Sequence, residues 1–455
     1  MSQRSMQWHG IKTRPVAFDQ LRVLKAGSIR VCSGRSPKKG KPLLSTRELQ
    51  ADAAAAPPSG RKRRGERERL VTWPFLLVTL STFAYFVSIG TLIPTLPLYV
   101  EGPLGGGSTS VGLAVGAFSV TAVLLRPWVG GLGDRRGRRL LIVAGSVFVG
   151  VSVAAYTLID SLPWLIVLRL VTGMGEAFFY VGAASAVNDM APEARRGEAL
   201  SLFSLALYSG IAVGPVLGET VLGDLGFHWV WLVSALAGGV AMLFGLFVPE
   251  TRTDVDEARS EGRGSLIHKA GLKPGVILLT SVWGLAGFNA LVPLYARDIG
   301  MDGSRMVFVV YSVVVLLIRS VGARIPDRMG AGPTARLALG VSVVGLTAMA
   351  AFGTPAGLIG GAVVFALGQA LAFPALMSIA VRGASPSERG RVVGTFTAFF
   401  DAAFGLGAVS LGFVADAVGF RGAFLVAGAV AAVGLVLLMR FRREPIQTAE
   451  AGAAV

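Results

Sequence analysis

The stretch GGLGDRRGRR, residues 130–139, marks the end of one long apolar segment and the start of the next. The first segment spans 109–132 and the second spans 140–159. A helix needs about 20 residues to cross the roughly 30 Å hydrocarbon core of a bilayer, and both segments have that length. Charged side chains are costly in lipid, so the arginine-rich stretch is predicted to be a loop at a membrane surface.

Apolar runs of this length recur from Trp73 onward. Hydrophobic residues make up 53% of the 455 residues and charged residues 15%, whereas soluble domains carry about 25% charged residues. This composition excludes a soluble enzyme, and helix-length runs argue against a β-barrel, whose strands have about ten residues. The twelve predicted segments are 73–99, 109–132, 140–159, 163–187, 199–222, 226–248, 274–296, 306–325, 337–353, 357–381, 392–415 and 422–439.

Basic residues gather in the loops of one side. Nineteen Lys and Arg residues lie on that side, against Arg297, Arg305 and Arg421 on the other. Basic loops stay in the cytoplasm, so this asymmetry predicts a multi-pass protein of the cytoplasmic membrane with both termini cytoplasmic.

Residues 1–69 are predicted to be a disordered basic tail. They are either an arm held at the anionic membrane surface or an extension without function, such as a mispredicted start. Nucleic-acid binding is not expected, because the tail lacks regularly spaced aromatic residues for base stacking. No cofactor or metal is expected either: Cys32 is the single cysteine, the three histidines lie far apart, and no phosphate-binding loop motif occurs.

The second six segments repeat the first six. Pro97-Leu98-Tyr99 returns as Pro293-Leu294-Tyr295, and Gly175-Glu176-Ala177 returns as Gly368-Gln369-Ala370. Arg126 and Asp134 return as Arg319 and Asp327, 193 residues later. Such a duplication is typical of secondary transporters. The predicted organisation is a tail at 1–69, a six-helix bundle at 70–248, a cytoplasmic linker at 249–272, a second bundle at 273–443 and a tail at 444–455.

Four stretches resemble motifs of the major facilitator superfamily. Residues 130–139 resemble its loop motif between helices two and three, and Asp327-Arg328-Met329-Gly330 resembles the copy between helices eight and nine. Residues 165–177 resemble its helix-four motif, and 210–218 resemble the helix-five motif associated with antiporters. The resemblance spans about 73–443. It implies an all-α polytopic membrane protein with twelve transmembrane helices in two pseudo-symmetric six-helix bundles, acting as a transporter and not as an enzyme.

The resemblance also implies a conformational gate at the loop motif. Asp189 and Glu193, at the end of the fourth segment, are candidate partners for Arg138. The alternative is that these arginines only follow the positive-inside rule. The gating residues are Gly130, Asp134, Arg135, Gly137, Arg138, Arg139, Asp189, Asp327 and Arg328.

Ionisable residues inside apolar segments usually face protein or a wet cavity, because exposing them to lipid is costly. Arg169, Glu176 and Tyr180 share one stripe of the fourth segment, and Asp401 is an acid near the middle of the eleventh. Asp401 or Glu176 is the predicted proton carrier, with Arg169 as a possible counter-ion of Glu176. The alternative for these charges is a fixed structural ion pair. The candidates for proton or substrate contact are Arg126, Arg169, Glu176, Tyr180, Arg319 and Asp401.

Two further groups lie outside this set. Glu219 and Arg324 are near segment ends, where they are expected to snorkel to the membrane surface or to pair locally. Gly210, Gly214 and Gly218 recur every fourth residue and predict a smooth helix face for close packing, with Pro215 bending the helix.

The expected function is proton-coupled efflux of a small amphipathic or drug-like molecule. The alternative is a facilitator or symporter of sugars or other small metabolites, because unrelated substrates share this scaffold. The expected partners are the substrate, protons and the lipid bilayer, and the chain is expected to act as a monomer.

Overall fold

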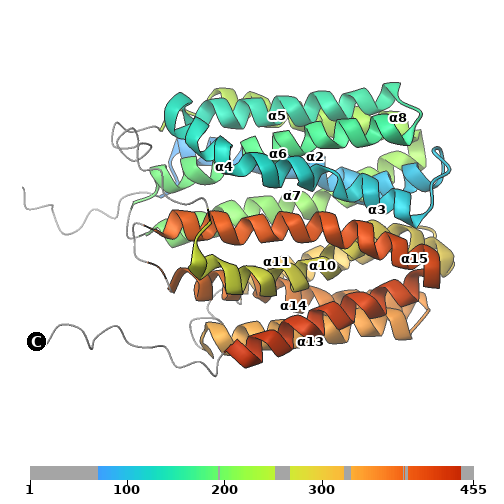
Figure 1. Cartoon of the computed structure of the whole chain (residues 1–455). Coiled ribbons are helices and arrows are strands. Elements are labelled where there is room, and N and C mark those ends of the chain that lie inside the picture. Colours follow the sequence, from blue (N-terminus) through green and yellow to red (C-terminus); the bar gives the residue numbers. More distant parts are fainter. Residues whose placement is uncertain are drawn as a thin grey trace, which may run out of the picture. The chain divides into compact units, whose positions relative to one another are not determined.

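The computed structural model describes residues 70–192, 195–251, 267–321, 329–382, 384 and 388–441, and over these residues it is helical without strands (Figure 1). The helices belong to one compact unit, Glu68–Val455. In the first half they are α2 (Trp73–Glu101), α3 (Ser108–Gly116), α4 (Phe118–Arg136), α5 (Arg138–Ala154), the 3-10 turn η2 (Ala155–Leu158), α6 (Leu162–Met190), α7 (Arg196–Leu225) and α8 (Phe227–Leu246). In the second half they are α10 (Lys269–Asp298), α11 (Arg305–Val321), α13 (Ala331–Ala351), α14 (Pro355–Arg382) and α15 (Arg389–Phe441).

Ten helical spans in the described residues are long and apolar enough to cross a membrane. α3 and α4 form one of them, interrupted at Ala117. α15 is a single run of 53 residues that changes direction at Gly419, so it contains two of the predicted segments. Counting the two arms of α15 separately and adding α11 gives the twelve predicted segments, and the all-helical membrane fold is confirmed.

The repeat is visible in the backbone as well as in the sequence. Six glycines have positive φ angles, a conformation that suits glycine because it lacks a Cβ. Gly137 and Gly330 are 193 residues apart, and each ends the turn just before a helix, α5 and α13. Gly226 and Gly419 are separated by the same 193 residues. Equivalent turns therefore connect equivalent helices in the two halves.

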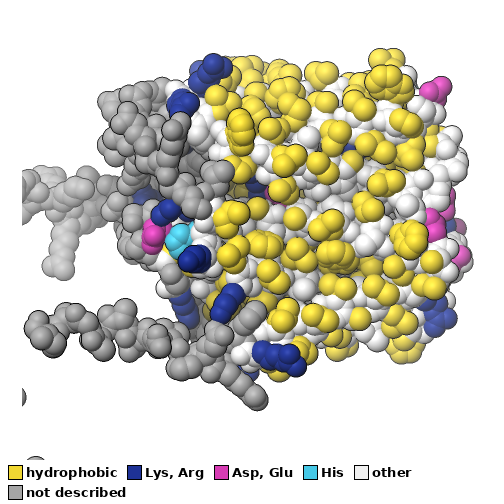
Figure 2. All heavy atoms as spheres, in the orientation of Figure 1, with side chains coloured by type: hydrophobic (Ala, Val, Ile, Leu, Met, Phe, Trp, Pro, Cys, Tyr) yellow, Lys and Arg dark blue, Asp and Glu magenta, His cyan; other side chains and the backbone are white. Residues whose placement is uncertain are grey.

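Hydrophobic side chains cover the surface between the two ends of the helices, and basic side chains gather mainly at one end (Figure 2). Trp128 and Leu124, for example, are 76% and 64% exposed. Such a belt is what the acyl chains of a bilayer require. We call the end with Arg135, Arg136 and Arg196 the arginine-rich end, and the end with the loops 102–107 and 299–304 the arginine-poor end.

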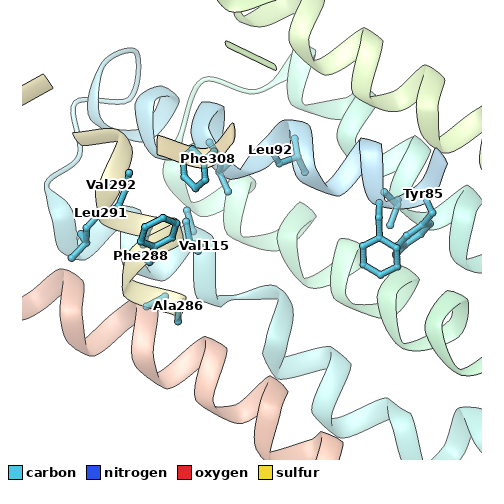
Figure 3. Packing of buried hydrophobic residues seen from close by; sticks show 14 of the residues in the cluster. Tyr85, Leu92, Val115, Ala286, Phe288, Leu291, Val292 and Phe308 are labelled. Atoms are coloured by element: carbon cyan, nitrogen blue, oxygen red, sulfur yellow. The ribbon is translucent and has the colours of Figure 1, made fainter. Parts of the chain in front are cut away.

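The two halves share one continuous core. Leu92 on α2 and Val115 on α3 belong to the same buried cluster as Phe288 and Leu291 on α10 and Phe308 on α11 (Figure 3). The rings of Phe288 and Phe308 are 5.5 Å apart in an edge-to-face arrangement. These residues lie in the parts of their helices nearer the arginine-poor end, so the halves pack closely there.

Candidate functional site

An ion pair connects the two halves inside the membrane-spanning region. Arg126 on α4 places Nε 2.8 Å from Oδ2 of Asp401 on α15, and its Nη2 donates to Oδ1 at 3.0 Å. The side chains are 12% and 2% exposed. The guanidinium also lies over the ring of Tyr180, 5.1 Å from its centroid. The pair therefore combines one charge-assisted hydrogen bond with a close second contact, and it can be lost when the carboxylate becomes neutral.

Glu176 and Arg169 lie on α6, on the stripe that the sequence predicts. Arg169 does not pair with Glu176: it donates through Nε and Nη2 to the carbonyl oxygens of Ala114 and Val115, at 2.8 and 3.1 Å. Those carbonyls are near the end of α3, where the helix leaves acceptors without partners of its own. Within the described chain Glu176 makes no hydrogen bond or ion pair, and Arg126 and Arg169 are the positive charges that act on it.

The equivalent arginine of the second half has a different partner. Arg319 on α11 donates through Nη2 to the hydroxyl of Tyr208 on α7 at 2.8 Å. Its guanidinium carbon lies 3.8 Å from the centre of the same ring. Tyr208 carries no charge, so a search for intramembrane ionisable residues does not find it; the repeat is the signal that identifies it, since it aligns with Asp401.

The loop motif caps a helix and forms an ion pair at the arginine-rich end. Arg138 Nε lies 3.3 Å from Oδ2 of Asp189. The backbone N–H groups of Arg138 and Arg139 donate to Glu250 at 2.7 and 3.3 Å, so this acid caps α5. Sequence reasoning missed Glu250, because a cap supplied from 112 residues away leaves no local pattern.

Other members of the predicted gate are placed only in part. Gly130 lies on α4 with no atom within 4 Å of the position of an added Cβ, and Arg135 is exposed at the end of this helix. The side chain of Asp134 and residues Glu193, Arg324, Asp327 and Arg328 lie outside the described part of the chain.

Two carboxylates join the halves at the arginine-poor end. Glu219 on α7 accepts the N–H groups of Ser304 and Arg305 at 3.1 and 2.7 Å, and also the Ser304 hydroxyl, at the start of α11. The expectation of a local partner for Glu219 is therefore wrong. Asp416 on α15 accepts the N–H groups of Ser108 and Thr109, each at 2.8 Å, at the start of α3. Each half thus caps a helix of the other half.

The predicted glycine face lies on α7 and packs against α2. A Cβ added at Gly210 would be 2.6 Å from the carbonyl oxygen of Phe83, and one at Gly218 would be 2.6 Å from that of Thr91. Gly214 meets the backbone of Gly90, and Pro215 is buried in the same helix. The absence of side chains lets the two backbones touch.

Helical repeats that meet at a buried, charge-bearing interface are the architecture of a secondary membrane transporter. The chain belongs to the major facilitator superfamily: the family model described as Major Facilitator Superfamily matches residues 78–359 and 305–454. The protein is therefore a multi-pass membrane transporter and not an enzyme.

Several other proteins resemble the chain along most of their length. An uncharacterized MFS-type transporter of Salmonella typhimurium is 27% identical over 380 residues, covering 81% of this chain and 96% of the relative. The staphylopine export protein of Staphylococcus aureus is 24% identical over 396 residues, covering 82% and 97%. The crystal structure of the human organic anion transporter MFSD10 has a TM-score of 0.64 at 19% identity, covering 80% and 98%.

Proposed function

We propose that this transporter exports a small amphipathic molecule in exchange for protons. The observation that carries the proposal is the Arg126–Asp401 pair, an ion pair between the halves that is buried in the membrane-spanning region and that protonation can break. The similarity to an export protein supports the direction. We also propose that the arginine-rich end and both termini face the cytoplasm, because basic loops remain on that side.

The pair gives a simple coupling cycle. Proton uptake by Asp401 neutralises the carboxylate and removes its attraction for Arg126, which frees α4 to move relative to α15. Proton release restores the pair and the original packing. One proton is bound and one is released per cycle, without a covalent step. Glu176, near Arg126 and without a described hydrogen-bond partner, is the competing proton carrier.

Alternating access also requires the arginine-poor end to open. The caps at Glu219 and Asp416 would have to break in that step. The Arg138–Asp189 pair joins α5 and α6 within the first half, so it can persist while the halves move apart. Because both halves of the site come from one chain, a monomer suffices for this cycle.

A facilitator or symporter of sugars or other metabolites is the second candidate function. It is favoured by the short Nε–Oδ2 and Nη2–Oδ1 distances between Arg126 and Asp401, which a fixed structural ion pair would also show. If the pair is fixed, Asp401 stays ionised throughout the transport cycle and no proton is exchanged.

Purified protein in liposomes with trapped pyranine tests the proposal, since this dye reports internal pH. Three probes share a naphthalene body and carry permanent charges of either sign or none: naphthalene-1-sulfonate, naphthalene-1-sulfonamide and (1-naphthylmethyl)trimethylammonium. At least one should move protons on addition and accumulate against its gradient under an imposed pH difference. Asp401→Asn should lose accumulation but keep exchange at equal pH, whereas Asp298→Asn, at an exposed carboxylate, should change nothing.

Each variant has a defined alternative outcome. If Asp401→Asn still accumulates the probe while Glu176→Gln does not, the proton carrier is Glu176. If both variants remain coupled, or if the wild type only equilibrates the probes, proton-coupled export is wrong and the facilitator is favoured.

A further inference from the structure

The repeat places two arginines in equivalent positions with unlike partners. Arg126 and Arg319 are 193 residues apart, and their partners Tyr208 and Asp401 are also 193 residues apart. Each arginine contacts the partner from the other half: Arg126 contacts Asp401, and Arg319 contacts Tyr208. In one copy a carboxylate neutralises the guanidinium. In the other copy the equivalent residue is a tyrosine, whose phenol is neutral, so the positive charge of the guanidinium is not neutralised.

The residues around the two arginines differ in the same way as their partners: acidic residues lie near Arg126, and neutral residues occupy the equivalent positions near Arg319. Glu176, near Arg126, has Gln369 as its equivalent, and Tyr180, which lies under Arg126, has Phe373. The second copy therefore contains an arginine and no acid at the equivalent positions. Within the described residues Arg319 donates a hydrogen bond to Tyr208, which is neutral, whereas Arg126 faces a carboxylate. A guanidinium inside a membrane protein gains strongly from an anionic partner.

A small apolar cavity of about 30 Å³ lies next to Tyr208, the hydrogen-bond partner of this arginine. Its wall includes Tyr208, Tyr311, Val315, Gln369, Phe373 and Phe400. Val315 is four residues before Arg319 on α11, so the two share a helix face, and Tyr208 touches both the cavity and the guanidinium. Gln369 directs its amide nitrogen towards Ser281, at 3.2 Å from the carbonyl oxygen. The wall is thus mainly aromatic and aliphatic, with a cation at its edge.

We propose that this site binds an organic anion: Arg319 holds a single carboxylate or sulfonate group, and the aromatic side chains around the cavity hold an apolar body. The cavity of about 30 Å³ must widen to admit that body, and the proposed movement of the halves supplies the opening. The assignment rests on the proposed transport function and specifies its substrate class. It also assigns different roles to the two copies of the repeat. The copy with Asp401 responds to protons, and the copy with Tyr208, which lacks the internal carboxylate, leaves its arginine to a ligand.

Binding of radiolabelled naphthalene-1-sulfonate to purified protein in an uncharged detergent tests this assignment. The wild type should bind the sulfonate at least about tenfold more tightly than the sulfonamide or the trimethylammonium probe, as expected for a hydrogen bond to a charged partner. Arg319→Gln should lose about the same factor. Tyr208→Asp should lose it too, because the new carboxylate occupies Arg319 as Asp401 occupies Arg126.

Two variants serve as controls. Tyr208→Phe keeps the ring and adds no charge, so its affinity should stay within about threefold of the wild type, and Arg319→Lys should keep most of the preference for the anion. Each variant must elute as a single species and keep its helical circular dichroism. Anion binding that survives in folded Arg319→Gln and Tyr208→Asp overturns the assignment, as does a wild type that prefers the neutral or cationic probe or binds none.

Anionic lipid headgroups share the same chemistry, so excess phosphatidylglycerol is added in a second series. The sulfonate should remain bound, whereas full displacement would assign the site to lipid and overturn the substrate class. No pH gradient is present in this assay. A failure of proton coupling in liposomes therefore leaves the binding result intact, and the two proposals can fail separately.

Discussion

A double-mutant cycle on Arg126 and Asp401 tests whether their contact holds the halves together. Removing one partner of a buried ion pair leaves an uncompensated charge, which costs about 3–5 kcal/mol. The two single variants should differ, because arginine stays charged whereas a carboxyl group can take up a proton. Asp401→Asn should therefore fall near the upper end of that range, and Arg126→Gln should cost less.

The double variant distinguishes pairing from simple burial. With both charges removed, no buried charge is stranded, so the loss should be about 2–3 kcal/mol smaller than the sum of the single losses. Tyr208→Phe is the matched comparison in the other half. It removes a neutral acceptor of a hydrogen bond from the charged Arg319 while keeping the ring under the guanidinium, so it should cost about 1.5–3 kcal/mol, less than the loss of a charged partner.

The free energy of unfolding is measured by titrating SDS into mixed micelles and following tryptophan fluorescence and circular dichroism. The cycle is carried out in one detergent and at one pH, so that the four proteins share a reference state. If the single losses add to within about 0.5 kcal/mol of the double loss, the side chains are energetically independent. The pair would then contribute nothing to holding the halves together, and the coupling cycle built on it would be refuted.

Two further predictions concern the helix packing. Replacing both Glu219 and Asp416 with Ala removes two caps, each worth about 1 kcal/mol, so spin labels in the loops 102–107 and 299–304 should move apart. An unchanged distance distribution would show that the caps do not hold this end closed. Gly173→Ala should destabilise by about 2–3 kcal/mol, because its Cβ would overlap the carbonyl oxygen of Phe118, whereas Gly239→Ala, with no atom within 4 Å, should be neutral or stabilising in the same unfolding titration; equal effects would contradict the packing of α6 on α4.

At the gating motif, the local sequence predicts the turn but only one of the two acidic partners. The sequence indicates a charged turn between two membrane helices, and the turn is present at Gly137, between α4 and α5. Its position follows from the end of an apolar run and from a glycine that can adopt positive φ. Asp189 is one of the two partners predicted for Arg138. Glu250, which caps α5 at the same turn, could not be predicted, because it follows α8 in the sequence, 112 residues after Arg138.

The spans, their number and the repeat follow from the sequence by itself. A bilayer imposes the same demand on each segment separately, namely enough apolar residues to cross it and a backbone that bonds internally, so each segment can be recognised without knowing its neighbours. Partners of the buried charges were decided only by the tertiary structure. Arg126 binds Asp401 and not Glu176, Arg169 binds carbonyl oxygens, and Arg319 lies on Tyr208, because which helices meet between the two halves depends on packing over hundreds of residues.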